Sequence, residues 1–294
     1  MHEWHHDVAK QLAGSRLSRV GQMRWRSVGG GSINRAYECV LDGRRYFVKC
    51  NEASRLGMFE AEAEGLRELG SKGPLRVPSV HALGHNGIHA WIVLEWLEKG
   101  TANEAVSARF GEQLACLHGV TASAFGWGRD NTIGSTPQPN AWMSSWHEFW
   151  AKRRLGFQIE LCRKNGLEAI YEKGQELLEL LPLIFSGHEP APSLLHGDLW
   201  GGNWFCDRRG QPVIFDPAVY YGDREADLAM TELFGGFSRT FYQAYAQTWP
   251  LDEGYAVRKH VYNLYHILNH ANLFGGGYVQ QARAMMERLV AECR

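Results

Sequence analysis

The chain has 294 residues, 45% of them hydrophobic, which is enough to bury a sizeable core. Its formal net charge of −1 offers no basic surface for a nucleic acid. No apolar run reaches the length of a membrane helix and the N-terminus lacks a signal-peptide pattern, so we expect a cytoplasmic protein without a membrane partner. The six cysteines show no C-x-x-C spacing, which favours reduced thiols over disulfides or a zinc site.

A short amphipathic helix is predicted near residues 8–12, and a glycine-rich turn follows it. The turn contains Gly29, Gly30, Gly31 and Ser32. Glycines let backbone amides approach phosphate oxygens closely, because no side chain stands in the way. We therefore predict a phosphate-binding turn, although a plain hairpin turn can have the same composition.

A strand-like run, RYFVKC, follows the hairpin turn Asp42-Gly43 and carries Lys49 near its end. The ATP-binding lysine of kinase-like folds occupies this position in the chain. An exposed lysine on an edge strand is the alternative interpretation.

Apolar residues at helical spacing predict a helix at Met58–Leu69. Three carboxylates lie on this helix, and Glu62 is nearest to its apolar face. We expect Glu62 to pair with Lys49 and to hold the ammonium group on the α- and β-phosphates of ATP. Glu60 and Glu64 are expected to be solvated charges.

An apolar, aromatic-rich strand is predicted at Gly87–Leu97, and its last residues are Glu95, Trp96 and Leu97. The pattern breaks directly afterwards, at Glu98-Lys99-Gly100. In a kinase-like chain this stretch is the hinge, whose backbone N–H and C=O groups bind the adenine edge.

Helical periodicity dominates from residue 103 onwards, which places a lobe boundary at Lys99-Gly100. Helices are predicted at residues 105–118, 146–163, 171–180, 226–234, 254–274 and 278–293. The predicted fold is α+β and two-lobed, like that of a protein kinase. A small β-rich lobe (1–99) joins a larger, mainly helical lobe (100–294), and ATP binds in the crevice.

The segment HGDLWGGN, followed by a second Asp after a short strand, carries the strongest functional signal. It places Asp198, Asn203 and Asp216 at the spacing of a kinase-type phosphoryl-transfer site. Asp198 would lie beside the incoming hydroxyl, while Asn203 and Asp216 would hold Mg²⁺ against the ATP phosphates. Two short strands around Arg208-Arg209-Gly210-Gln211 predict a hairpin that brings both metal ligands to one edge.

Structural alternatives exist for each of these residues. Asp198 could be a cap or a solvated loop residue, and Asn203 could close a turn. Asp216 is harder to explain in this way, because it follows the buried run Val-Ile-Phe and a carboxylate there requires a partner. His196 is expected to hold the loop through hydrogen bonds and not to transfer a proton.

The chain resembles the fructosamine kinases, or ketosamine-3-kinases, a branch of the kinase-like superfamily that includes aminoglycoside phosphotransferases and choline kinases. The Asp198, Asn203 and Asp216 pattern is common to all these branches. Narrower matches are GGGSI, FGWGRDNTIGSTPQPN, HGDLWGGNW, DPAVYYGDREADLAMTELFGG and YHILNHANLFGGGY, which together cover nearly the whole chain in order.

The resemblance implies transfer of the γ-phosphoryl group of ATP, with Mg²⁺, to the 3-hydroxyl of a ketosamine. The unstable phosphate would then release the amine, so the implied role is deglycation of small amines or protein lysines. Asp198 would accept the proton, Lys49 and Glu62 would position ATP, and a monomer or weak homodimer is expected. Candidate acceptor residues are Trp200, Tyr220, Asn269 and His270, although each aromatic ring could instead be core packing.

Two other functions stay open at this point. An aminoglycoside- or choline-type phosphotransferase would share the fold and the catalytic motif. A non-catalytic nucleotide-binding protein is a third possibility, but the joint presence of Lys49, Asp198, Asn203 and Asp216 argues against it. Carboxylates in GDREAD are expected to brace the catalytic loop and not to touch the substrate.

Overall fold

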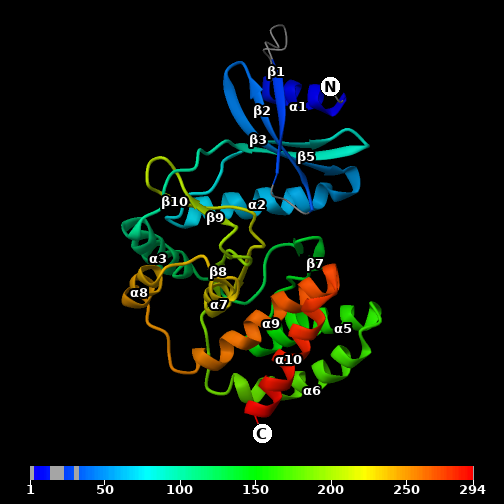
Figure 1. Ribbon diagram of the computed structural model, residues 1–294, viewed down its shortest axis with the longest axis vertical. Helices are drawn as coiled ribbons and strands as arrows, with labels where there is room; N and C mark the ends of the chain where they lie inside the picture. The colour runs from blue at the N-terminus through cyan, green and yellow to red at the C-terminus, as the bar shows by residue number, and fades with distance from the viewer. Residues whose placement is uncertain (1–2, 14–22, 30–32, 294) are drawn as a thin grey trace.

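The computed structural model describes residues 3–13, 23–29 and 33–293 (Figure 1). Its upper part is an antiparallel sheet in the order β1-β2-β3-β5-β4, and its lower part is mainly helical. The strands are β1 (Met23–Val28), β2 (Arg35–Leu41), β3 (Arg44–Glu52), β4 (Val80–His85) and β5 (His89–Glu95). The predicted α+β, two-lobed architecture is confirmed.

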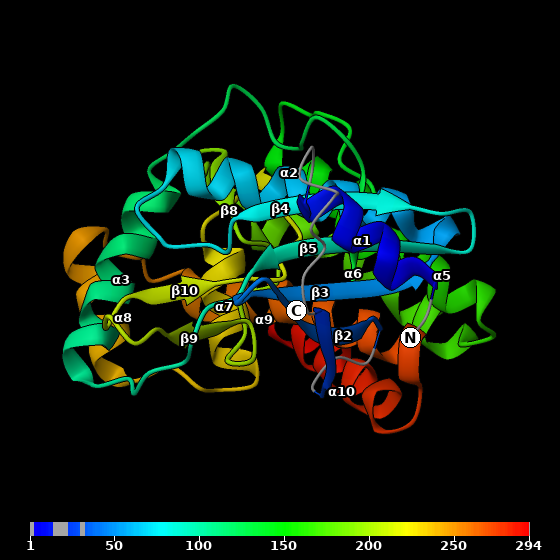
Figure 2. The ribbon, with the colours of Figure 1, turned by 90° about the horizontal axis from the view of Figure 1, so that it is seen from above.

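Two helices cover the opposite faces of this sheet, as Figure 2 shows from above. They are α1 (Glu3–Ala13) and, after a 3₁₀ turn at Ala53–Arg55, α2 (Leu56–Lys72). Alternate residues of β5 face the two helices, because successive side chains of a strand point to opposite sides. Trp91 and Val93 pack with α1, whereas Ala90, Ile92 and Leu94 pack with α2. Strand β5 is therefore buried on both faces.

The chain crosses from the sheet to the helices between β5 and α3 (Glu104–His118). Asn103 caps α3, since its side chain accepts a hydrogen bond from the Val106 amide at 3.0 Å. Within the crossing, the N–H of Gly100 donates to the carbonyl of Cys206 at 2.7 Å. The predicted boundary at Lys99-Gly100 falls in this stretch, and the division into two domains there stays a prediction.

The lower part consists of helices and three two-stranded ladders. After α3 the helices are α4 (Trp146–Phe149), α5 (Gly156–Lys164), α6 (Glu168–Ile184), α7 (Glu225–Leu233), α8 (Arg239–Thr248), α9 (Tyr255–Phe274) and α10 (Gly277–Glu292). The ladders pair β6 (Asn131–Ile133) with β7 (Thr136–Gln138), β8 (Ser193–Leu195) with β11 (Tyr220–Gly222), and β9 (Trp204–Cys206) with β10 (Pro212–Ile214). In the described part of the chain, no helix has the length and apolar character to span a membrane.

The structure differs from the predicted helices in two places. The single helix predicted at 146–163 is interrupted by a π-helical stretch, Trp150–Leu155, which contains the buried Arg154. Arg154 lies over the Tyr220 ring at 3.9 Å and donates to Asn140 Oδ1 at 2.6 Å. Helix α8 was not predicted, because its apolar face is formed by a few aromatic residues between polar ones.

Candidate active site

Strand β3 and helix α2 bring Lys49 and Glu62 together between the two parts of the molecule. Lys49 Nζ lies 2.6 Å from Glu62 Oε1, and both residues are buried. Lys49 Nζ also contacts Asp216 Oδ1. Burial lowers the pKa of Lys49, but the charges of Asp216 and Glu62 outweigh it and raise that pKa above its ordinary value. The pairing of Lys49 with Glu62 is the one that the sequence predicts.

The loop that carries Asp198 follows β8 and is fixed by a buried carboxylate. Asp227 accepts the backbone N–H groups of His196 at 2.7 Å and of Gly197 at 2.8 Å. Gly197 has φ 81°, and a Cβ there would lie 2.1 Å from the carbonyl oxygen of Ala218. Of the three GDREAD carboxylates expected to brace this loop, Asp227 contacts it directly.

His196 is fully buried and holds the loop through both ring nitrogens. Nδ1 accepts the N–H of Asp198 at 3.2 Å, so Nε2 carries the hydrogen and donates to the carbonyl of Phe215 at 3.0 Å. Burial lowers the pKa of His196, which keeps the ring neutral. This arrangement agrees with the predicted structural role.

The hairpin of β9 and β10 brings Asn203 and Asp216 to the same place as Asp198. Asn203 Nδ2 donates to Asp198 Oδ2 at 3.1 Å and to the Asp198 carbonyl at 2.8 Å. Phe215 N donates to the carbonyl of Asn203 at 3.1 Å, which joins the two ends of the hairpin. Asp216 has φ 57°, a left-handed conformation that Asp adopts more readily than most residues.

The electrostatics of this cluster favour a cation. Burial raises the pKa of Asp198 to about 7, and the nearby charge of Asp216 adds to this effect. Among the described residues no hydrogen bond reaches Asn203 Oδ1, since its amide nitrogen faces Asp198. Two carboxylates and an amide oxygen are hard donors of the kind that Mg²⁺ prefers, so the residues fit this ion.

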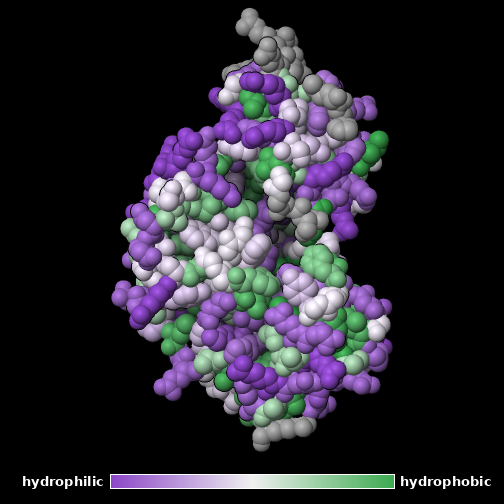
Figure 3. Space-filling model, viewed as in Figure 1, coloured by the Kyte–Doolittle hydropathy of each residue, from purple (hydrophilic) through white to green (hydrophobic). Residues whose placement is uncertain are grey.

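The predicted phosphate-binding turn is described at its first residue. Gly29 is exposed at the end of β1, whereas Gly30, Gly31 and Ser32 lie outside the described residues. The surface in Figure 3 is hollowed on its right-hand side, where the sheet-bearing part meets the helical part.

The side chains of the predicted hinge make contacts of their own. Glu95 Oε1 accepts from Arg76 at 2.9 Å, and Arg45 lies 4.4 Å over the Trp96 ring. Leu97 is partly buried directly after them. The N–H of Glu95 also donates to the carbonyl of Ser79 at 2.8 Å, and adenine binding by the backbone of this stretch stays a prediction.

Two of the predicted acceptor residues belong to an exposed group of aromatic rings. Trp200 is 40% exposed and its ring centre lies 6.2 Å from that of Phe234. The His270 ring lies 5.4 Å from Phe234 and 4.9 Å from Tyr278. Since Trp200 is only two residues from Asp198, this surface borders the catalytic cluster.

The other two predicted acceptor residues lie in the interior, and their contact with a substrate stays a prediction. Tyr220 is 3% exposed, and its ring lies against Phe149 and Arg154. Asn269 is also 3% exposed, and its side chain bonds to Gln158 Nε2 and to the carbonyl of Ile133, each at 3.3 Å.

The sequence analysis missed His266, which lies on the buried face of α9. Its Nδ1 is 3.9 Å from Asp198 Oδ1, and its carbonyl accepts from His270 Nδ1 at 2.7 Å. The two histidines are four residues apart, so they lie one above the other on the helix. The spacing of four residues between His266 and His270 was the feature of the sequence that could have indicated His266. It extends the aromatic surface at His270 toward Asp198.

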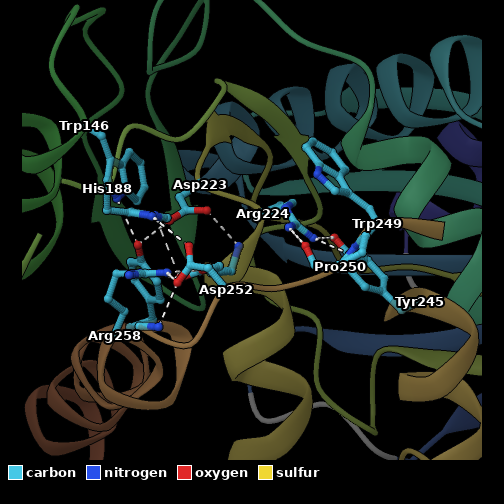
Figure 4. A network of polar contacts seen from close by, with 12 residues as sticks. Trp146, His188, Asp223, Arg224, Tyr245, Trp249, Pro250, Asp252 and Arg258 are labelled. Atoms are coloured by element: carbon cyan, nitrogen blue, oxygen red, sulfur yellow. Dashed lines mark hydrogen bonds and ion pairs between the residues drawn. The ribbon is translucent and has the colours of Figure 1, made fainter. Parts of the chain in front are cut away.

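A second cluster with metal-ligand chemistry joins α7 to the start of α9. Figure 4 shows His188, Asp223, Asp252 and Arg258 pointing toward one another. His188, Glu225 and Asp252 could in principle hold an ion. However, Arg258 already bonds to Glu225 at 2.7 Å and to Asp252 at 2.6 Å. The carboxylates are neutralised by an internal cation, so this cluster is an ion-pair network.

The chain matches the fructosamine kinase family model over residues 4–292. A protein of Synechocystis named "probable ketoamine kinase" is 49% identical over 96% of this chain and 95% of its own length. The protein-ribulosamine 3-kinase of Arabidopsis thaliana is 40% identical over 97% of this chain and 86% of its own length.

Solved structures agree with this assignment. The crystal structure of a fructosamine-3-kinase candidate from Haemophilus somnus has a TM-score of 0.89 at 31% identity and covers 96% of both chains. A more distant aminoglycoside phosphotransferase, at 15% identity, has a TM-score of 0.62 over 98% of both chains and so shares the fold. The sequence match over nearly the whole chain places this protein in the fructosamine kinase family.

Proposed function

We propose that this protein is an ATP-dependent kinase that phosphorylates the 3-hydroxyl of ketosamines, as a step in deglycation. The observation that carries the proposal is the double contact of Lys49 with Glu62 and Asp216, beside Asp198 and Asn203. An amine and four oxygen-bearing side chains from distant parts of the chain converge there. Relatives named ketoamine kinase and protein-ribulosamine 3-kinase support the substrate class.

In the proposed reaction, Lys49 neutralises the α- and β-phosphates and Glu62 holds its ammonium group in place. The predicted turn Gly29–Ser32 would cover the phosphates, and the backbone at residues 95–97 would bind adenine. Asn203 and Asp216 would hold Mg²⁺, which supplies charge neutralisation for the transferred phosphoryl group.

Asp198 accepts the proton of the 3-hydroxyl as the sugar oxygen bonds to the γ-phosphorus. The bond from that phosphorus to the bridging oxygen breaks at the same time, and ADP leaves. A pKa near 7 suits this role, since about half of such a base is deprotonated at neutral pH and can take up a proton.

The exposed aromatic rings provide a surface for the acceptor. Trp200 would stack against the sugar, and His270 would bind its hydroxyl groups. Both side chains are accessible, unlike Tyr220 and Asn269. An apolar ring surface with a few polar groups is typical of sites for small hydroxylated ligands.

A parallel ADP-release assay tests the proposal against the alternatives. Fructosyl-lysine, ribulosyl-lysine, kanamycin and choline would be compared at equal ATP and Mg²⁺ concentrations. We expect release with a ketosamine and not with kanamycin or choline. Release with kanamycin or choline alone would point to a different phosphotransferase, and no release with any acceptor would favour a non-catalytic nucleotide-binding protein.

A further inference from the structure

Helix α2 lies between the sheet and the helical part of the molecule (Figure 1). Glu62 points inward to Lys49. The carboxylates of Glu60, Glu64 and Glu68 are spaced by four residues, so they form one stripe, which we call the outer face of α2. The side chains of Glu60 and Glu64 are 41% and 50% exposed, as expected for solvated charges, and both also pair with Arg129 from the helical part.

Glu68 accepts hydrogen bonds from two buried aromatic residues of the helical part. Trp127 Nε1 donates to Oε2 at 2.6 Å, and the Tyr221 hydroxyl donates to Oε1 at 2.8 Å. Lys72, one turn further along α2, donates to Oε1 at 2.8 Å as well. Burial raises the pKa of Glu68, but these three hydrogen bonds outweigh it and hold that pKa below its ordinary value.

Arg129 makes a second set of contacts one turn away. Its Nη1 donates to Glu64 Oε1 at 2.7 Å, and its Nη2 reaches Glu60 Oε2 at 3.3 Å and the carbonyl of Gly57 at 3.4 Å. One guanidinium thus spans the first two turns of α2. The planar fork of arginine favours such a fixed geometry.

These partners are joined to the chain that follows Asp216. Gly126 and Tyr221 exchange both backbone hydrogen bonds, at 2.9 and 2.8 Å. Asn131 Nδ2 donates to the carbonyl of Val219 at 2.8 Å. The residues of the helical part that bind α2 are thus attached to the segment that follows Asp216, the proposed metal ligand.

α2 also approaches this segment directly. At Gly65 an added Cβ would lie 2.9 Å from Val219 Cγ2, and Val219 is fully buried. The helix therefore rests on this segment with no room for a larger residue.

We propose that Glu68 and Arg129 are positioning residues, which fix α2 to the helical part so that Glu62 stays on Lys49. The inference rests on the proposed roles of Lys49 and Glu62 in binding ATP. This role differs from a general stabilising role, because it acts through the ion pair of Lys49 with Glu62. In this protein the ATP-positioning helix is held in its working position by contacts within the chain.

The contacts must act together to have this effect. Glu64, Glu68 and Arg129 line a cavity of about 630 Å³, so solvent reaches the ion pairs. Exposed ion pairs contribute little one at a time. Trp127 and Tyr221 are only 6% and 4% exposed. Their hydrogen bonds to Glu68 therefore fix the position of its carboxylate.

A double-mutant cycle tests the proposal. The variant with Glu68→Ala and Arg129→Ala is compared with wild type, and the same two changes are made in a Glu62→Gln background. We expect kcat to fall about tenfold or more in the wild-type background and less than about threefold further when Glu62 is already replaced. Conservative replacements, Glu68→Gln and Arg129→Lys, should restore part of the rate.

Arg67→Ala is the matched control, because Arg67 is exposed on the same helix and contributes to none of these contacts. Its kcat should stay at the wild-type value. Equal losses in both backgrounds would show that Glu68 and Arg129 serve general stability, and no loss in the wild-type background would also overturn the proposal.

The affinity for Mg·ATP is measured for the same variants in both backgrounds. This measurement needs no acceptor. If wild type shows no turnover with any acceptor, the proposed reaction fails while the positioning role is still decided by this affinity. We expect the double variant to weaken Mg·ATP binding in the wild-type background and not in the Glu62→Gln background. Equal weakening in both would overturn the positioning role.

Discussion

The imidazole of His266 lies beside the carboxylate of Asp198, with Nδ1 3.9 Å from Oδ1. Burial, together with the nearby His270, lowers the pKa of His266 to about 3, so the ring is neutral at physiological pH. It therefore brings no positive charge to Asp198, and Lys49 is already engaged by Glu62 and Asp216. Asp198 is therefore left in an environment that raises the pKa of its carboxyl group.

Replacing Asp198 with Asn should lower kcat by about 10²- to 10⁴-fold, the usual contribution of a positioned general base. The affinity for Mg·ATP should change little, because the side chain keeps its size and its contact with Asn203. Single-turnover kinetics and nucleotide titration would measure the two effects separately. Near-normal turnover would remove Asp198 from its proposed role.

The same substitution should make the metal-free, nucleotide-free protein more stable. Asp198 has a pKa of about 7 when folded and about 3.9 when unfolded, so the unfolded chain gives up the proton first as pH rises. Ionisation therefore costs the folded state stability between pH 4 and 7, and the full cost is present above pH 7. Asp198→Asn should raise Tm more at pH 8 than at pH 5, and an equal rise at both values would contradict the argument.

Motif spacing was sufficient to predict the catalytic cluster, because the geometry there depends on short local segments. Asp198, Asn203 and Asp216 lie on one loop and one hairpin, so a few turn residues fix their relative positions. The pairing of Lys49 with Glu62 followed from the apolar face of a single helix. Whether these residues have the assigned roles remains a prediction.

The acceptor residues could not be predicted in the same way, since their exposure depends on packing between distant helices. Tyr220 and Asn269 are as close to the motifs as Trp200 and His270, yet they face Arg154 and Gln158 in the interior. The contacts of Arg129 with α2 span about 65 residues of chain. No local periodicity carries such information, because it arises only when the two parts are docked.

Replacing Asp216 with Asn should weaken the affinity for ATP in the presence of Mg²⁺ by at least about tenfold. Asn adopts the left-handed conformation as readily as Asp, so the backbone at φ 57° is retained while one negative charge is lost. ATP titrations at several Mg²⁺ concentrations would measure the change. The difference from wild type should vanish in EDTA, and an unchanged affinity with Mg²⁺ would mark Asp216 as purely structural.

Replacing His188 with Gln should destabilise the protein in a pH-dependent way, through the network in Figure 4. Burial lowers the pKa of His188, but the hydrogen bond of 2.6 Å to Asp223 and its charge raise that pKa above the ordinary value. A raised histidine pKa stabilises the folded state fully below about pH 6.5, and this stabilisation is lost as pH rises through the folded value. The loss of Tm should therefore be larger at pH 6 than at pH 9. If the His188 variant lost the same Tm at both pH values, the network would hold the histidine in its neutral form.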